Sequence, residues 1–200
     1  MIHIFQNNGY FITRDWWENK DTRAVMSFAV KHGNTPTLAE IVANAVEVLS
    51  PRRHGNYAKG LLAYDAWRAA IFNDDEFPAD IGEAGLRDRL MCQNDAMDCL
   101  MDGRHNAARF FKNTATQHPQ HAELCDTMAA HFEEVFGACA KMRGLLYPGG
   151  LGHEEHLRRL ADSEIRGRIC VLIDEAKSAD TKALDAMKQL LAQLEKEPKQ

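Results

Sequence analysis

The chain has 200 residues, of which 45% are hydrophobic and 26% charged, and its formal net charge is −5 at pH 7. A chain of this length and ordinary globular composition can bury a core without disulfides or metal ions. Because the balance is acidic and no long run of Lys or Arg occurs, we expect no nucleic-acid partner.

Residues 2–13 have the pattern of a β-hairpin. Two short apolar segments flank the pair Asn8-Gly9, which favours the positive φ angles of a tight primed turn. Apolar residues then alternate with others in 23–30, which predicts a third strand, with a short helix as the alternative. We expect residues 1–33 to form a small antiparallel β element of two to three strands, which could be the edge of a larger sheet.

From residue 34 to the C-terminus, the apolar residues recur at helical spacing. The first helix is marked by a capping box, in which Thr37 precedes Glu40 by three residues, and it ends at Ser50. Further helices are predicted at 57–72, 83–116 (with a break or kink at Gly103), 119–146 and 153–177, followed by a last helix that Asp180 caps. The predicted fold class is therefore mainly α, with a bundle of about six helices in a domain that spans residues 34–200.

The cysteines and the hydropathy indicate where the protein resides. No two of the five cysteines have C-x-x-C spacing. They are Cys92, Cys99, Cys125, Cys139 and Cys170. Cys92 and Cys99 are seven residues apart, which is the spacing of a buried helical face, so we expect packed, reduced thiols and a cytoplasmic protein. No signal-peptide pattern and no run of 18 apolar residues is present, so we expect no membrane span.

No motif in the chain carries catalytic chemistry. The histidine pairs His118/His121 and His153/His156 do not form an H-E-x-x-H motif, and no G-x-S-x-G motif surrounds a serine. We therefore expect no catalytic residue, no metal and no cofactor. An enzyme that holds a metal through histidines stays open as an alternative.

Aromatic residues suggest a ligand pocket, with a plain core as the alternative. A helix at 57–72 would place Tyr57, Tyr64 and Trp67 in one apolar sector, and the helix start would offer N–H groups to an anion. Two arginines in a later helix adjoin an apolar face, where buried ion pairs are the other explanation. The residues that we expect to bind a ligand are Trp16, His54, Asn56, Tyr57, Tyr64, Trp67, Arg104 and Arg109. The expected ligand is small, partly aromatic or acyl, and carries a carboxylate.

Two segments resemble a known group of proteins. Residues 54–78 contain a Gly-x-x-Ala-Tyr-x-x-Trp pattern that begins at Gly60, and residues 100–115 contain an Arg-x-x-Ala-x-x-Phe pattern that begins at Arg104. The chain thereby resembles the helical region of uncharacterised bacterial proteins with a papain-like domain of the bacteriocin-leader-peptidase type, which are similar to the butirosin-biosynthesis acyltransferase. The resemblance implies a papain-like domain or partner chain that supplies the nucleophile, since no residue here matches it.

These features together predict a non-catalytic helical accessory domain that binds a small molecule or covers the active site of a partner. Besides the metal-dependent enzyme, a purely structural dimerisation module is an alternative, so a homo-oligomer stays open.

Overall fold

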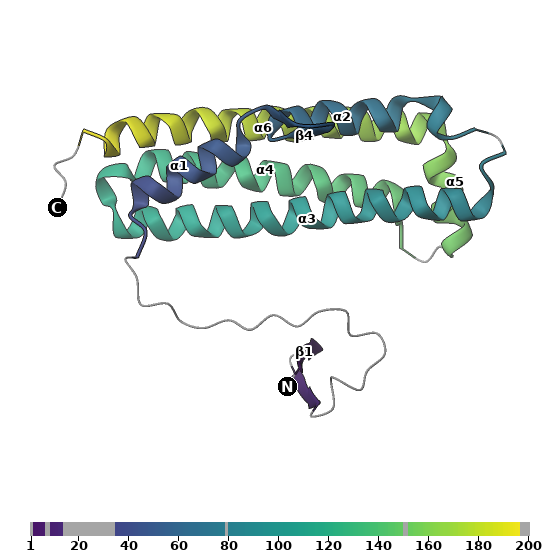
Figure 1. Ribbon diagram of the computed structural model, residues 1–200, viewed down its shortest axis with the longest axis horizontal. Helices are drawn as coiled ribbons and strands as arrows, with labels where there is room; N and C mark the ends of the chain where they lie inside the picture. The colour runs from purple at the N-terminus through teal and green to yellow at the C-terminus, as the bar shows by residue number, and fades with distance from the viewer. Residues whose placement is uncertain (1, 7–8, 14–34, 79, 150–151, 197–200) are drawn as a thin grey trace. The chain divides into compact units, whose positions relative to one another are not determined.

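The computed structural model describes residues 2–6, 9–13, 35–78, 80–149 and 152–196. The chain divides into two units, Met1–Thr35 and Pro36–Gln200. Within the described residues, the chain has six α-helices and two short antiparallel hairpins (Figure 1). The predicted fold class, mainly α with a small N-terminal β element, is confirmed.

The first unit contains the predicted N-terminal hairpin. Its strands are β1 (Ile2–Gln6) and β2 (Gly9–Thr13), and Gln6 pairs with Gly9 at the closed end. Gly9 therefore lies in a strand, and the connecting residues 7–8 are outside the described part of the chain. The predicted third strand at 23–30 also lies outside it.

The second unit is a helical bundle built on three long helices. These are α3 (Gly82–Gln117), α4 (Ala122–Leu146) and α6 (Ser163–Leu194). Helix α4 packs between α3 and α6, while α1 (Leu38–Leu49) and α2 (Leu61–Phe72) follow one another along α6 (Figure 1). The short helix α5 (His153–Ala161) precedes α6, and two 3-10 turns, η2 (Asp74–Glu76) and η3 (Pro119–His121), precede α3 and α4.

The core lies where the apolar faces of these helices meet. Helix α4 contributes a face of large and small residues at spacings of three and four, and α6 contributes a matching face. The fully buried side chains of these two faces include Met128, Val135, Met142, Ile169, Ile173 and Leu190. Burying each such side chain stabilises the fold by roughly 1.5–3 kcal/mol, so helix packing rather than local propensity holds the bundle together.

The capping box that begins α1 is present as predicted. The backbone N–H of Glu40 donates to the Thr37 hydroxyl at 3.2 Å, and the backbone N–H of Thr37 donates to Glu40 Oε2 at 2.7 Å. Two N–H groups that the helix cannot satisfy internally are thus paired.

Two predicted helix boundaries are wrong. Gly103 does not break α3, because the cost of one helical glycine, about 1 kcal/mol, is outweighed by the packing of α3 on α4. Asp180 does not cap a helix, because α6 continues through it; the cap is Asp162, whose Oδ1 accepts from the N–H groups of Glu164 and Ile165. The predicted 153–177 helix therefore divides at Asp162 into α5 and α6.

The predicted helix at 57–72 begins four residues late. Residues 52–59 form a second hairpin, β3 (Arg52–His54) and β4 (Tyr57–Lys59), and α2 begins only at Leu61. The reason is Gly60, which has φ +59° and whose added Cβ would lie 2.2 Å from the Ser50 carbonyl oxygen. A helix that started at Tyr57 would need Gly60 in helical geometry, and the close approach of Gly60 to the end of α1 prevents this.

Candidate functional site

Two of the predicted ligand residues meet in a buried polar network. The hydroxyl of Tyr64, on α2, donates to Asp180 Oδ2 at 2.6 Å. Arg104, on α3, donates to both carboxylate oxygens of the same residue, from Nε to Oδ1 at 2.8 Å and from Nη2 to Oδ2 at 2.6 Å. Asp180 lies on α6 and is fully buried, so the network joins three helices through one carboxylate.

The surroundings of this network hold Tyr64 and the nearby Cys139 neutral and Arg104 charged. Burial, and then the negative charge of Asp180, raises the pKa of the Tyr64 hydroxyl. Burial disfavours the charged form of Arg104, but its hydrogen bonds to Asp180 and the charge of that carboxylate prevail, so the pKa of Arg104 is raised. Burial raises the pKa of the nearby Cys139 thiol to about 12, with Asp180 adding to the effect. Tyr64 and Cys139 therefore stay neutral and Arg104 stays charged.

This network is suited to holding helices in register rather than to chemistry. The guanidinium of Arg104 also lies over the ring of Phe132, 5.6 Å from its centroid, which fixes it against α4. Among the described residues, no buried side-chain nitrogen or oxygen lacks a hydrogen-bond partner. Tyr64 and Arg104 thus use their polar groups within the fold, as the buried-ion-pair alternative predicts for Arg104.

Another arginine, which is buried, ties the ends of three helices together. Arg166 donates to the carbonyl oxygens of Ile71 at 3.2 Å and Ala161 at 2.5 Å, and it also pairs with Asp74. These carbonyls belong to the C-terminal ends of α2 and α5, where a cation is favoured. The ring of Phe77 covers the guanidinium at 4.3 Å. This arginine is also structural.

The remaining predicted ligand residues do not gather around one cavity in the described structure. Trp67 is half-buried and donates from Nε1 to Gln93 Oε1 at 2.5 Å. His54, Asn56 and Tyr57 lie on the β3–β4 hairpin and are exposed, so the prediction that Tyr57 shares an apolar helical sector with Tyr64 is wrong. Arg109 is exposed, and Trp16 lies outside the described residues. A ligand role for these residues stays a prediction.

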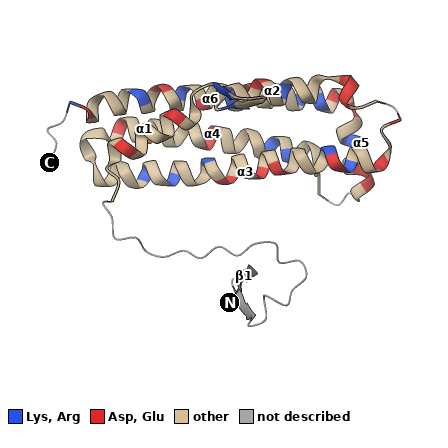
Figure 2. Cartoon of the chain, viewed as in Figure 1, with Lys and Arg blue, Asp and Glu red and all other residues tan. Residues whose placement is uncertain are grey.

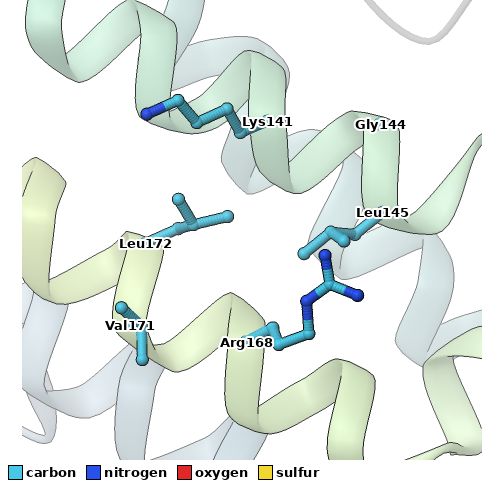
Figure 3. A pocket seen from close by; sticks show the side chains of 6 residues that line it. All are labelled: Lys141, Gly144, Leu145, Arg168, Val171 and Leu172. Atoms are coloured by element: carbon cyan, nitrogen blue, oxygen red, sulfur yellow. The ribbon is translucent and has the colours of Figure 1, made fainter.

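A groove lies between α4 and α6 on the described surface. It has a volume of about 460 Å³, which is within the usual range for small-molecule sites. Its lining residues are Lys141, Gly144, Leu145, Arg168, Val171 and Leu172 (Figure 3). Figure 3 shows the side chain of Leu172 pointing into the space between the two helices and the guanidinium of Arg168 lying beside Leu145.

The groove combines an apolar floor with two cations. Val171 is 58% exposed, and Gly144 has no atom within 4 Å of the position that a Cβ would take. The Lys141 Nζ lies 3.7 Å from Glu175 Oε2, so these two side chains form an ion pair. Arg168 has no acidic partner within the described part of the chain. The arrangement can hold an apolar body on Leu145 and Leu172 and an anionic group against Arg168.

The thiols divide into two classes. Cys125, Cys139 and Cys170 are buried as predicted, but Cys92 and Cys99 are exposed on α3. The spacing of seven does put Cys92 and Cys99 on one side of the helix, but that side faces away from the core. Spacing alone therefore identified a shared face without saying which way it points.

Comparison with known proteins adds no family. No protein-family model, no curated protein and no solved structure matches the chain. Within the residues that the structure describes, no three His, Cys, Asp or Glu side chains form a group that could hold a metal ion. No described helix is long and apolar enough to cross a membrane.

Sequence reasoning missed Asp180 and the two cations of the groove. Asp180 follows Ile173 and Ala176 at helical spacing and precedes Ala183 and Met187, so it stands alone in a continuous apolar stripe. That position was the available signal for a buried carboxylate. Lys141 and Arg168 carry no such signal, because each is an ordinary exposed cation until α4 and α6 pack side by side.

Proposed function

We propose that this chain is a non-catalytic binding module for a small anionic molecule with an apolar body, which is held in the groove between α4 and α6. The observation that carries the proposal is the position of Arg168, an exposed guanidinium without an acidic partner among the described residues, at the edge of an apolar floor. An apolar surface beside an unpaired cation is complementary to an amphiphilic anion.

The structure of the groove supports a ligand of this kind. Leu145 and Leu172 come from different helices and meet across the groove, so a bound apolar group would bury surface on both. Lys141 lies on the opposite helix from Arg168, and its side chain extends away from the Arg168 guanidinium (Figure 3). Because Lys141 pairs with Glu175, Arg168 is the main cation that the groove offers to an anionic ligand.

Anilinonaphthalene sulfonate tests the proposal directly, since it is a fluorescent molecule with apolar rings and one anionic group. We expect saturable binding with one site per chain. Arg168→Gln is expected to weaken it about fivefold, the effect of roughly 1 kcal/mol for one exposed ion pair. Lys182→Gln is the matched control, because Lys182 is an exposed cation on the same helix, about 21 Å further along at 1.5 Å per residue.

Filling the groove gives an independent test. Gly144→Leu places an apolar side chain in open space at the floor of the groove, so it should abolish binding while the fold is retained. Gly144→Ala serves as its control and should leave most binding intact. The proposal is wrong if Gly144→Leu binds the dye as the wild type does, or if Lys182→Gln weakens binding as much as Arg168→Gln.

The other predicted roles have no support from particular contacts. A papain-like domain or partner chain, the cover for its active site and a dimerisation role each stay a prediction. No metal-binding group among the described residues favours the metal-dependent enzyme. Binding in the α4–α6 groove is the only one of these roles for which the described structure offers a candidate site.

A further inference from the structure

The β3–β4 hairpin is an exposed ribbon that takes almost no part in the core. All residues from Arg52 to Tyr57 are exposed, and the side chain of Tyr57 is 74% exposed. A two-stranded ribbon that buries little apolar surface is marginally stable by itself. Its base is held by Gly60, which packs against the carbonyl groups of Leu49 and Ser50 at the end of α1. Core packing does not account for the residues that the ribbon displays.

One face of the ribbon is cationic and aromatic. The register pairs Arg52 with Lys59 and His54 with Tyr57, and residues directly opposite each other in an antiparallel ladder share a face. Since successive residues alternate between faces, these four side chains project on the same side of the ribbon. Part of the ribbon is blue in Figure 2, where Lys and Arg residues lie.

The ribbon is positive although the whole chain is negative. It carries Arg52, Arg53 and Lys59 in a chain of net charge −5. Arg52 pairs with Glu47 at 2.5 Å, whereas Arg53 and Lys59 make no ion pair with any described residue. Arg and Tyr are also the residue types that most often dominate the energetics of protein interfaces.

We infer that the β3–β4 hairpin docks an acidic segment of a partner protein. Arg52, Lys59 and His54, which share a face with Tyr57, would contact its carboxylates, and the exposed ring of Tyr57 would pack on its apolar side chains. A long nucleic acid fits less well, because three cations are few for a phosphate backbone and the negative charge of the rest of the chain repels a polymer that extends beyond the ribbon.

The test uses the full chain and a fluorescein-labelled oligoglutamate peptide, with binding measured by fluorescence anisotropy at low ionic strength. Replacing the two cations of the face that carries Tyr57, Arg52→Gln with Lys59→Gln, should weaken binding about tenfold or more. Glu47→Gln should strengthen it, because Arg52 loses its internal partner. The matched control is Lys182→Gln with Lys188→Gln, which removes two exposed cations of α6 and should change affinity little.

Three results would overturn the inference. The peptide fails to bind the wild-type chain; the control pair weakens binding as much as the hairpin pair does; or an oligothymidylate of the same charge binds the hairpin more tightly than the peptide. The variants concern exposed side chains, so circular dichroism should show an unchanged helical fold. The opposite sign expected for Glu47→Gln gives a readout that loss of folding cannot imitate.

Discussion

The hydroxyl of Tyr64 donates a 2.6 Å hydrogen bond to the carboxylate of Asp180, which is 116 residues further along the chain and fully buried. A carboxylate in a core is stable only when its lone pairs are satisfied, and here Tyr64 and Arg104 satisfy them from two other helices. The contact therefore ties α2 to α6 in one register.

Replacing Arg104 alone should lower the free energy of unfolding more than replacing Arg104 and Asp180 together. Arg104→Met leaves the Asp180 carboxylate buried without its counter-charge, so we expect a loss of about 3–5 kcal/mol in the free energy of unfolding. Adding Asp180→Leu to Arg104→Met should restore much of that loss, and Tyr64→Phe alone should cost about 1–2 kcal/mol. Urea unfolding measures all three. Equal stabilities of Arg104→Met and the double variant would contradict this account.

Two glycines with positive φ should respond differently to alanine. Gly55 has φ +56° and open space around it, so Gly55→Ala should cost about 1–2 kcal/mol from backbone strain alone. Gly60→Ala should cost more, because its Cβ would also collide with the Ser50 carbonyl oxygen at 2.2 Å. Thermal unfolding of the two variants gives the comparison. If Gly55→Ala proves the more damaging, the close contact at Gly60 is not what fixes the hairpin.

The five cysteines should react in two groups. Cys92 and Cys99 are exposed, whereas Cys125, Cys139 and Cys170 are buried. An aromatic disulfide reagent at mildly alkaline pH should modify two thiols in the native protein and all five in denaturant. Burial raises the pKa of the Cys139 thiol to about 12, so it should be among the slowest to react. Modification of the double variant Cys92→Ser with Cys99→Ser in the native state would contradict the assignment.

The capping box should respond to acid. The backbone N–H of Thr37, followed by its hydroxyl, lowers the pKa of Glu40 from its ordinary value of 4.5. A lowered pKa in the folded state means that the contribution of Glu40 to stability is fully present above 4.5 and is lost as the pH falls through the lowered pKa. A nuclear magnetic resonance titration should find the Glu40 pKa below 4.5. The Thr37→Ala variant removes the hydroxyl and keeps the backbone N–H, so it should bring the Glu40 pKa part of the way back to 4.5; an unchanged value would show that the hydroxyl does not contribute.

The sequence by itself determined the helices and the ends that local chemistry fixes. The spacing of apolar residues predicted long helices, and the Thr37–Glu40 pair predicted the start of α1, because both patterns depend only on residues within a turn or two. The N-terminal hairpin was predicted for the same reason. Errors arose where a local signal was ambiguous, as at Gly103 and at Asp180, since a glycine or an aspartate can lie inside a helix or at its end.

Only the tertiary structure decided what the polar residues do. Asp180 is a buried acceptor rather than a cap because α2 and α3 bring Tyr64 and Arg104 to it, and no local pattern encodes those partners. Helix α2 begins later than predicted because Gly60 lies against the end of α1. The α4–α6 groove likewise exists only once Leu145 and Leu172 meet across two helices. The physical reason is common to all three: burial and ion pairing depend on distances between segments far apart in the chain, and hydrophobic periodicity fixes which face of a helix is buried but not which partner it meets.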